Sequence, residues 1–226
     1  MSIFNIKESK VKAAAFVATG LYLALVAMFF AYVPVPYKFR LPVGLLCVAS
    51  LWLTPWEISL ALLFSTIGDF AGSTGHFIAQ MGTFAVAHVF YITFFVRRYI
   101  RKGTKMTSKM QGYIMMLGIC VAALLALIFA KVVPAVPSGI LKTGVSIYAV
   151  MISVMLFSAL MQRSIFYAFG ALLFVVSDFL LAWNKFIEPI PYYDAIILGT
   201  YFAAQWLFFI RATPYRVKHP VHLMRF

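Results

Sequence analysis

Charged residues are scarce in this sequence, and acidic residues are scarcer still. Only 11% of the 226 residues are charged, and six are Asp or Glu. Because a soluble domain is normally about a quarter charged, this composition excludes an ordinary water-soluble globular protein. It also excludes a disordered chain, since 64% of the residues are hydrophobic and disordered chains are poor in such residues. We therefore expect an all-α, polytopic integral membrane protein, a single transmembrane domain over residues 1–226 with about eight short spans.

Several motifs are absent as well. The two cysteines, Cys47 and Cys120, lie inside apolar runs and form neither a disulfide framework nor a metal-binding pair. There is no HExxH motif and no third carboxylate at helical spacing, so we expect no metal site and no cofactor. There is also no GxSxG elbow and no phosphate-binding glycine loop, which leaves serine hydrolase chemistry and nucleotide use unsupported.

Basic residues, by contrast, are abundant: 19 Lys and Arg give a formal net charge of +13. In a soluble protein this charge would suggest nucleic acid as a partner. Here the basic residues fall in predicted loops and termini, which is typical of the positive-inside bias of membrane proteins. We therefore expect the lipid bilayer as the partner and no nucleic acid.

Prolines divide the apolar sequence into segments, because proline breaks a helix interior but is tolerated at its edges. The eight predicted spans are 12–33, 40–54, 56–72, 76–96, 111–131, 141–161, 164–184 and 191–211. Fusing residues 41–70 into one kinked helix would leave seven spans. It would also bury Glu57 near the bilayer centre, which is costly unless the carboxylate is paired. Two helices that turn at Thr54-Pro55 are the better prediction.

The basic residues also predict the orientation. With eight spans, 14 of the 19 Lys and Arg residues fall on the side of the two termini, six of them in the loop 97–109, and five fall on the other side. The positive-inside rule then places both termini in the cytoplasm. We expect a multi-pass protein of the bacterial inner membrane.

The two halves of the sequence resemble each other. Residues 62–70 read LLFSTIGDF, and residues 172–179 read LLFVVSDF. The next span in each half carries Gly-Thr, with a polar residue six positions after that glycine: His88 in the first half and Gln205 in the second. With an even number of spans in each half, the pattern predicts a parallel 4+4 repeat.

Ionisable groups inside the bilayer are the residues most informative about function. Four of the six acids fall at predicted helix ends or loops, where a carboxylate is solvated: Glu8, Glu57, Glu188 and Asp194. Asp69 and Asp178 instead lie about 13 and 14 residues into their spans, roughly 20 Å from the cytoplasmic edge. A carboxylate there can simply join neighbouring helices by a hydrogen bond, but a pair at matched depth favours acid–base chemistry.

Other polar residues in the spans are candidates for contact with a substrate. The predicted substrate-binding residues are His88, Tyr91, Tyr148, Tyr201 and Gln205. The histidine and the glutamine can equally be hydrogen-bonded packing residues, and the tyrosines can be packing or interfacial residues. Gly68-x-x-x-Gly72 is a small-residue packing motif beside Asp69.

Five short segments carry a family resemblance: Gly68-Asp69; Gly82-Thr83-Phe84 with His88 and Tyr91; Gly170-Ala171-Leu172-Leu173-Phe174; Ser177-Asp178; and Tyr201-Phe202-Ala203-Ala204-Gln205. From about residue 38 to 211, the chain resembles the YhhN-like lysoplasmalogenase family. It departs from the family where Lys38 and Pro42 are separated rather than adjacent. The resemblance implies an eight-helix membrane hydrolase that cleaves lysoplasmalogens. These lysophospholipids carry one vinyl-ether chain, which is released as a fatty aldehyde and leaves glycerophosphoethanolamine or glycerophosphocholine.

The candidate residues fit this reaction. A vinyl ether hydrolyses when its β carbon receives a proton and water captures the resulting oxocarbenium ion. One carboxylic acid can donate the proton while an ionised neighbour stabilises the cation and activates water. We therefore expect Asp69 and Asp178 to be the catalytic pair, about 5–9 Å apart, with His88 and Gln205 on the same cavity. The alternatives are a secondary transporter with intramembrane aspartates and a non-catalytic scaffold.

Overall fold

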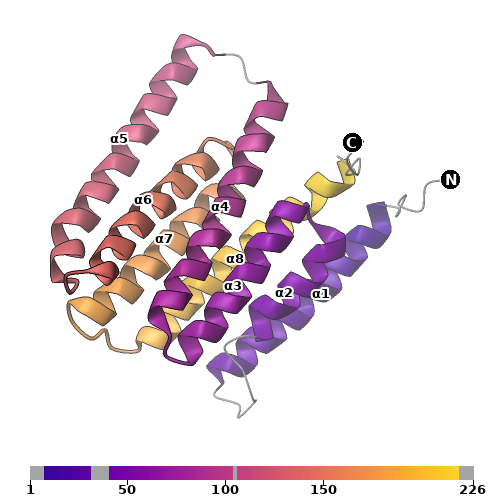
Figure 1. Ribbon diagram of the computed structural model, residues 1–226. Helices are drawn as coiled ribbons and strands as arrows, with labels where there is room; N and C mark the ends of the chain where they lie inside the picture. The colour runs from indigo at the N-terminus through magenta and orange to yellow at the C-terminus, as the bar shows by residue number, and fades with distance from the viewer. Residues whose placement is uncertain (1–7, 32–40, 104–105, 219–226) are drawn as a thin grey trace, which may run out of the picture.

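The structure, a computed structural model, describes residues 8–31, 41–103 and 106–218. Within these ranges the chain forms eight α-helices and one short 3₁₀ helix, with no strand (Figure 1). The helices are α1 (Glu8–Phe30), α2 (Leu41–Leu53), α3 (Trp56–Ser73), α4 (Phe77–Lys102), α5 (Ser108–Lys131), η1 (Val133–Ala135), α6 (Ile140–Leu160), α7 (Ile165–Phe186) and α8 (Tyr193–Lys218). The predicted all-α fold class is confirmed.

Six of the described helices are long and apolar enough to cross a membrane: α1, α4, α5, α6, α7 and α8. α2 is a shorter apolar helix of 13 residues, and α3 has 18 residues. The chain is therefore an integral, multi-pass membrane protein. The orientation prediction rests partly on Lys38, Arg40 and the tail beyond residue 218, which lie outside the described ranges.

Helices α2 and α3 form a hairpin that turns at Thr54-Pro55. The Ser59 hydroxyl donates to the Ser50 carbonyl oxygen at 2.9 Å, and farther along the pair Gly44 faces the side chain of Thr66. Contacts in which one residue number falls as the other rises require the two helices to run antiparallel. The single kinked helix over residues 41–70 is thus excluded, and the two-helix prediction is confirmed.

Two helices extend beyond their predicted ends. α4 continues to Lys102, so Arg97, Arg98, Arg101 and Lys102 are helical rather than part of a loop. Cations favour the C-terminal turn of a helix because they face the negative end of its dipole, and Gly103 ends α4 in the left-handed conformation with φ 55°. α8 continues through Pro214 to Lys218, although proline removes one helical hydrogen bond.

The helices pack side by side in one bundle, with α5 and α6 at one edge and α1 and α2 at the other (Figure 1). The most extensive contacts join α3 to α4 and α7 to α8. Gly68 permits the first of these close approaches, because a Cβ there would lie 2.9 Å from Thr83 Oγ1 and 3.0 Å from the Phe84 ring. The predicted packing role of Gly68 is confirmed.

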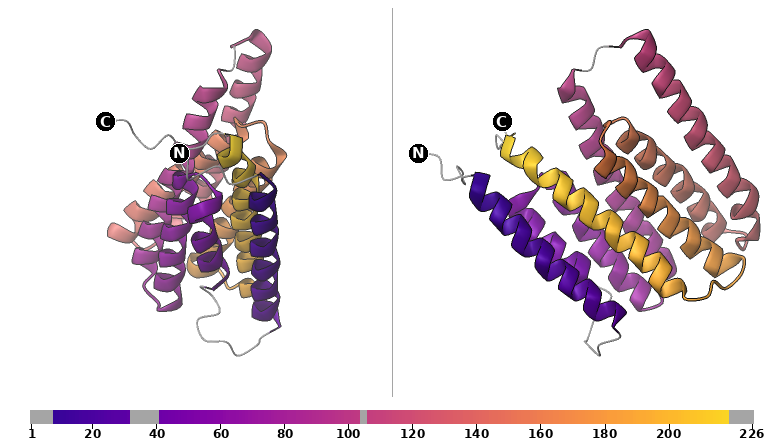
Figure 2. Two further views of the ribbon diagram at one scale, coloured as in Figure 1. Left: turned by 90° about the vertical axis from the view of Figure 1, so that its right-hand side faces the viewer. Right: turned by 180° about the vertical axis from the view of Figure 1, so that it is seen from behind.

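The helix contacts follow the predicted repeat in part. Asp69 and Asp178 each lie 13 positions after the first residue of their helix, Trp56 and Ile165. Between the halves, α2 contacts α8 and its counterpart α6 contacts α4. The outer helices differ, because α1 packs on both α2 and α8, whereas its counterpart α5 packs mainly on α6 and lies at the edge of the bundle (Figure 2). The start of α1 and the end of α8 lie at the same end of the molecule (Figure 2).

Candidate active site

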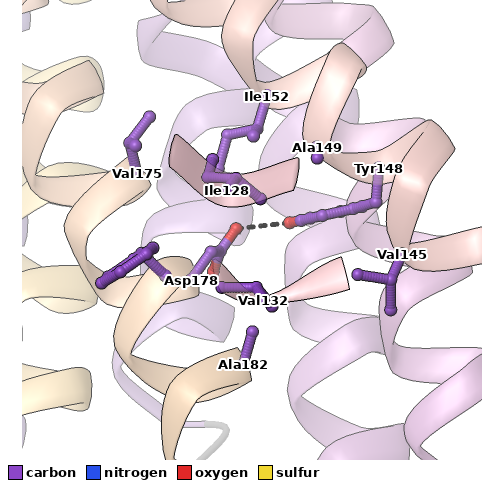
Figure 3. Close-up of a pocket in the computed structure, with 10 residues that line it drawn as sticks. Ile128, Val132, Val145, Tyr148, Ala149, Ile152, Val175, Asp178 and Ala182 are labelled. Atoms are coloured by element: carbon purple, nitrogen blue, oxygen red, sulfur yellow. Dashed lines mark hydrogen bonds between the residues drawn. The ribbon is translucent and has the colours of Figure 1, made fainter. Parts of the chain in front are cut away.

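Asp178 of α7 faces a pocket between α5, α6 and α7 (Figure 3). Tyr148 of α6 donates a hydrogen bond to Asp178 Oδ2. The rest of the lining is apolar: Ile128, Val132, Val145, Ala149, Ile152, Val175, Phe179 and Ala182. The pocket therefore combines one carboxyl group and one phenol with walls of hydrocarbon.

The pocket is small and lies toward the exposed edge of the bundle. Its volume is about 40 Å³, which is room for a few water molecules. α5 forms one wall, and only 11% of the apolar segment of that helix is buried within the chain. The other faces of α5 are therefore open to lipid in a membrane, and Asp178 lies one helix away from the hydrocarbon.

Asp69 of α3 belongs to a second group of polar side chains. Tyr201 of α8 donates to Asp69 Oδ2 at 3.1 Å. Nearby, Tyr91 donates to Gln205 Oε1 at 2.5 Å, and Gln205 Nε2 donates to Ser65 Oγ at 3.0 Å. All five side chains are buried, and we refer to them as the Asp69 network. Buried polar groups are stable when hydrogen-bonded, and this network satisfies its members with side chains from α3, α4 and α8.

His88 of α4 carries an unfilled hydrogen-bond acceptor. Its Nδ1 lies 2.6 Å from the Phe84 carbonyl oxygen, and because a carbonyl only accepts, Nδ1 carries the proton. Nε2 has no hydrogen-bond partner in the described part of the chain, and the side chain is fully buried. In the neutral ring Nε2 is thus an acceptor without a donor, which is rare for a buried polar atom.

Aromatic rings connect the surroundings of the two carboxylates. The His88 ring meets Tyr148 edge-on with 5.4 Å between centroids, and it meets Phe174 at 4.8 Å. Phe174 also contacts Tyr201 at 5.5 Å. Phe174 thus contacts the tyrosine partner of Asp69 directly and the tyrosine partner of Asp178 through the His88 ring. The two carboxylates are close enough to interact electrostatically.

The structure brings the predicted site residues together in two groups rather than around one cavity. Asp178 and Tyr148 line the pocket. The other predicted site residues are not among its lining residues: Asp69, His88, Tyr91, Tyr201 and Gln205. Whether His88 and Gln205 border a cavity shared with the two aspartates stays a prediction. Between the two groups, Phe84 and Phe174 pack edge-to-face at 6.3 Å.

Two residues that contribute to this arrangement were not predicted. Ser65 lies four residues before Asp69, and Phe174 lies four residues before Asp178. Residues at this spacing share a helix face, so helical periodicity could have identified both. A lone serine and a phenylalanine in apolar spans carry no chemical signal of their own, however, and only the packing shows their role.

The prediction that Glu57 is solvated is wrong. Its side chain is buried, and its Oε1 lies 2.8 Å from Arg97 Nη1 of α4. The Arg97 guanidinium also lies 5.6 Å from the centre of the Trp56 ring. A carboxylate at a buried helix end needs a cation nearby, and Arg97 supplies it. Glu57 therefore ties the start of α3 to the last turns of α4.

Comparison with known proteins identifies the family. A model of the YhhN family matches residues 14–211. The chain belongs to the YhhN family. This family member is similar to lysoplasmalogenase TMEM86A of Homo sapiens, with 32% identity over 178 residues, which are 72% of this chain and 68% of the relative.

Two further relatives show the same likeness. Lysoplasmalogenase TMEM86A of Bos taurus is 32% identical over 173 residues, 71% of this YhhN chain and 66% of the relative. Lysoplasmalogenase TMEM86B of Homo sapiens is 29% identical over 153 residues, 67% of this chain and 61% of the relative. The matched part thus covers 61–68% of the length of these three relatives. No solved structure matches the chain. Among the described residues, no group of three or more His, Cys, Asp or Glu could hold a metal ion.

Proposed function

We propose that this YhhN family member is a membrane-embedded hydrolase of the lysoplasmalogenase type. It cleaves the vinyl-ether bond of a lysoplasmalogen to give a fatty aldehyde and glycerophosphoethanolamine or glycerophosphocholine. The observation that carries the proposal is Asp178, a carboxyl group in the wall of an otherwise apolar pocket beside the lipid-facing α5. The likeness to the human lysoplasmalogenases supplies the substrate class.

Asp178 is the proposed general acid. Its Oδ2 accepts the hydrogen bond from Tyr148, which leaves the other oxygen available to carry a proton into the pocket. A carboxyl group in apolar surroundings is more stable neutral than charged. The acid gives its proton to the β carbon of the vinyl ether, the electrons of the double bond form the new C–H bond, and an oxocarbenium ion remains.

Asp69 and His88 are proposed to serve the second half of the reaction. Asp69, the second carboxyl group, lies within electrostatic range of Asp178, and its oxygens stabilise the positive charge of the oxocarbenium ion. Water adds to the cationic carbon, and His88 Nε2, the unfilled acceptor, takes the proton that the water loses. The hemiacetal then breaks its bond to the glycerol oxygen, which gains a proton as the hemiacetal hydroxyl loses one and becomes the aldehyde.

The remaining polar residues are proposed to position this machinery. Tyr201 holds Asp69, and the bonds between Tyr91, Gln205 and Ser65 fix the same part of the bundle. Tyr148, which lines the pocket, is the tyrosine placed to contact substrate as well as Asp178. We also propose that both termini lie in the cytoplasm and that the chain resides in the bacterial inner membrane, on the basis of its distribution of basic residues.

The test is aldehyde release by the purified full-length chain in detergent micelles. The substrate is a 1-alkenyl lysophosphatidylethanolamine, and the matched control is the 1-alkyl ether of the same chain length, which has no double bond to protonate. We expect aldehyde and glycerophosphoethanolamine in equal amounts from the alkenyl lipid only. Absence of turnover with alkenyl lipids of either headgroup would contradict the proposal and favour a transporter or a scaffold.

A further inference from the structure

Away from the two aspartates, four cationic side chains gather where the end of α4, the α6–α7 turn and α8 meet. We refer to Arg98, Lys102, Arg163 and Arg211 as the cationic cluster. Lys102 is close enough to the other three for electrostatic repulsion. The Lys102 ammonium donates to the Gln162 carbonyl oxygen at 2.7 Å, and Arg98 Nη1 donates to Gln162 Oε1 at 3.1 Å. The cluster is thus built around the α6–α7 turn.

Tyr167 holds two of the four cations in place. The Arg98 and Arg211 guanidinium carbons lie 5.1 and 5.7 Å from the centre of its ring. Arg211 Nε also donates to Ser164 Oγ at 3.3 Å, and the side chain of Arg98 is buried. Because these two side chains are already ordered, little conformational entropy is lost when an anion binds to them. Lys102 and Arg163 are exposed and can close on the anion from solvent.

The four cations of the cluster repel one another. Glu57, the acid at the start of α3, is paired with Arg97, which lies just outside the cluster. The positive-inside bias explains why basic residues lie at this end of the helices, but it does not require four of them to share one place. Like charges held together are stabilised by a bound anion.

The N-terminus of α7 adds to the same potential. This helix of 22 residues begins at Ile165, directly after Ser164, which makes no side-chain cap hydrogen bond. The N-terminal N–H groups of a helix and its dipole favour an anion such as phosphate. The start of α7 therefore adds backbone donors next to Arg163 and Ser164, at the edge of the cationic cluster.

The surface next to the cluster is apolar. Ile165, Phe166 and Phe169, on the first turns of α7, are 75%, 43% and 51% exposed. We propose that the cationic cluster binds the phosphate group of an anionic glycerophospholipid, whose acyl chains lie against this surface. Free inorganic phosphate would make no use of the apolar residues.

This lipid is not the reacting substrate. Asp178 lies 13 positions after Ile165, about 20 Å farther along α7. In a glycerophospholipid the phosphate and the ether oxygen are joined through the three glycerol carbons, so one molecule cannot reach both places. The lipid on the cluster is therefore an accessory ligand, and its binding does not depend on the proposed hydrolase activity.

The experiment titrates phosphatidylglycerol with a fluorescent acyl chain into the full-length chain in neutral detergent at constant ionic strength. The test variant is K102Q/R163G, in which glycine suits the left-handed backbone of Arg163, φ 51°. The matched control is K10Q/K109Q, which removes two exposed charges predicted to lie on the same side of the membrane. K102R/R163K keeps the charge and serves as the rescue variant.

We expect K102Q/R163G to weaken phosphatidylglycerol binding by at least about tenfold, while the control stays within about twofold of wild type. K102R/R163K should bind like wild type. Equal weakening in the test and control variants would overturn the site in favour of diffuse charge, as would unchanged binding by K102Q/R163G. Competition by inorganic phosphate, at the concentrations at which the lipid binds, would show that the cluster binds free phosphate. That result would overturn the proposed lipid site. If the double variant does not fold, K102Q and R163G are compared singly.

Discussion

At the residue scale, the site depends on tyrosine hydroxyls that hold aspartates across helices. Tyr148 donates to Asp178 and Tyr201 donates to Asp69, and each hydroxyl fixes one carboxyl oxygen. The surroundings differ, because Asp178 lines an apolar pocket while Asp69 lies in a buried polar network. The proposed division of roles rests on this difference in surroundings, because the environment of a carboxyl group decides its part in acid–base chemistry.

Replacing Tyr148 by phenylalanine tests the first of these hydrogen bonds. The ring contact with His88 survives, but Asp178 loses its donor. We expect kcat for aldehyde release to fall about tenfold with little change in KM, since one hydrogen bond to a reacting group is lost. Tyr113→Phe is the control, because Tyr113 donates to the Leu160 carbonyl at 3.4 Å, away from the pocket. Equal activities of the two variants would show that Tyr148 does not position the acid.

Replacing His88 by asparagine tests the unfilled acceptor. An asparagine amide N–H can keep the bond to the Phe84 carbonyl that Nδ1 makes, while nothing replaces Nε2. We expect kcat to fall about 10²-fold, the usual worth of a placed base, with thermal stability close to wild type. A variant that is equally stable and equally active would remove His88 from the mechanism.

At the scale of the elements, sequence patterns predicted the positions of the helices better than they predicted which helices pack together. The turn at Thr54-Pro55 followed from a proline at a helix edge, and the close packing of α3 on α4 followed from Gly68. The extension of α4 to Lys102 was not predicted, because its last turns are charged. A span predicted from hydropathy stops where charged residues begin. Asp69 and Tyr201 are 132 residues apart in sequence, and helical periodicity shows which face is buried but not which helix covers it.

The contact between α3 and α4 at Gly68 gives a test at this scale. Gly68→Ala places a Cβ 2.9 Å from Thr83 Oγ1 and 3.0 Å from the Phe84 ring, so the packing of these side chains between α3 and α4 must shift. We expect a destabilisation of about 1–3 kcal/mol, measured as a lower midpoint of thermal unfolding in detergent. Gly82→Ala is the matched control, because its added Cβ meets nothing within 4 Å and alanine favours a helix by up to about 1 kcal/mol. A Gly68→Ala protein as stable as the Gly82→Ala protein would contradict the packing account.

At the scale of the whole molecule, the orientation in the membrane is open to a direct test. In a variant with Cys47 and Cys120 replaced by alanine, single cysteines are placed at Ser108, the first residue of α5, and at Ser138, just before α6. Both positions are exposed. With cytoplasmic termini, an impermeant maleimide should label S138C in intact cells and S108C only after permeabilisation. Labelling of S108C in intact cells would reverse the proposed topology.

In the proposed function, the bundle as a whole holds two carboxyl groups inside the hydrocarbon near a lipid-facing edge. Two halves with similar contacts bring Asp69 and Asp178 to the same position in their helices, while α5 diverges from its counterpart α1 and forms a wall of the pocket beside Asp178. A symmetric scaffold would need no such difference. A hydrolase that takes its substrate from the bilayer does, because one carboxyl group must meet the lipid.

The most direct test is the turnover of a vinyl-ether lysolipid by Asp178→Asn. Asparagine keeps the shape of the side chain and can still accept from Tyr148, but it cannot donate a carboxyl proton. The account predicts that kcat for aldehyde release falls at least about 10²-fold with KM nearly unchanged. Asp69→Asn should show a similar loss, and the double variant should be little worse than either single one. Asp194→Asn, at an exposed acid at the start of α8, should remain fully active. Turnover by Asp178→Asn at the level of Asp194→Asn, in equally folded preparations, would contradict the account.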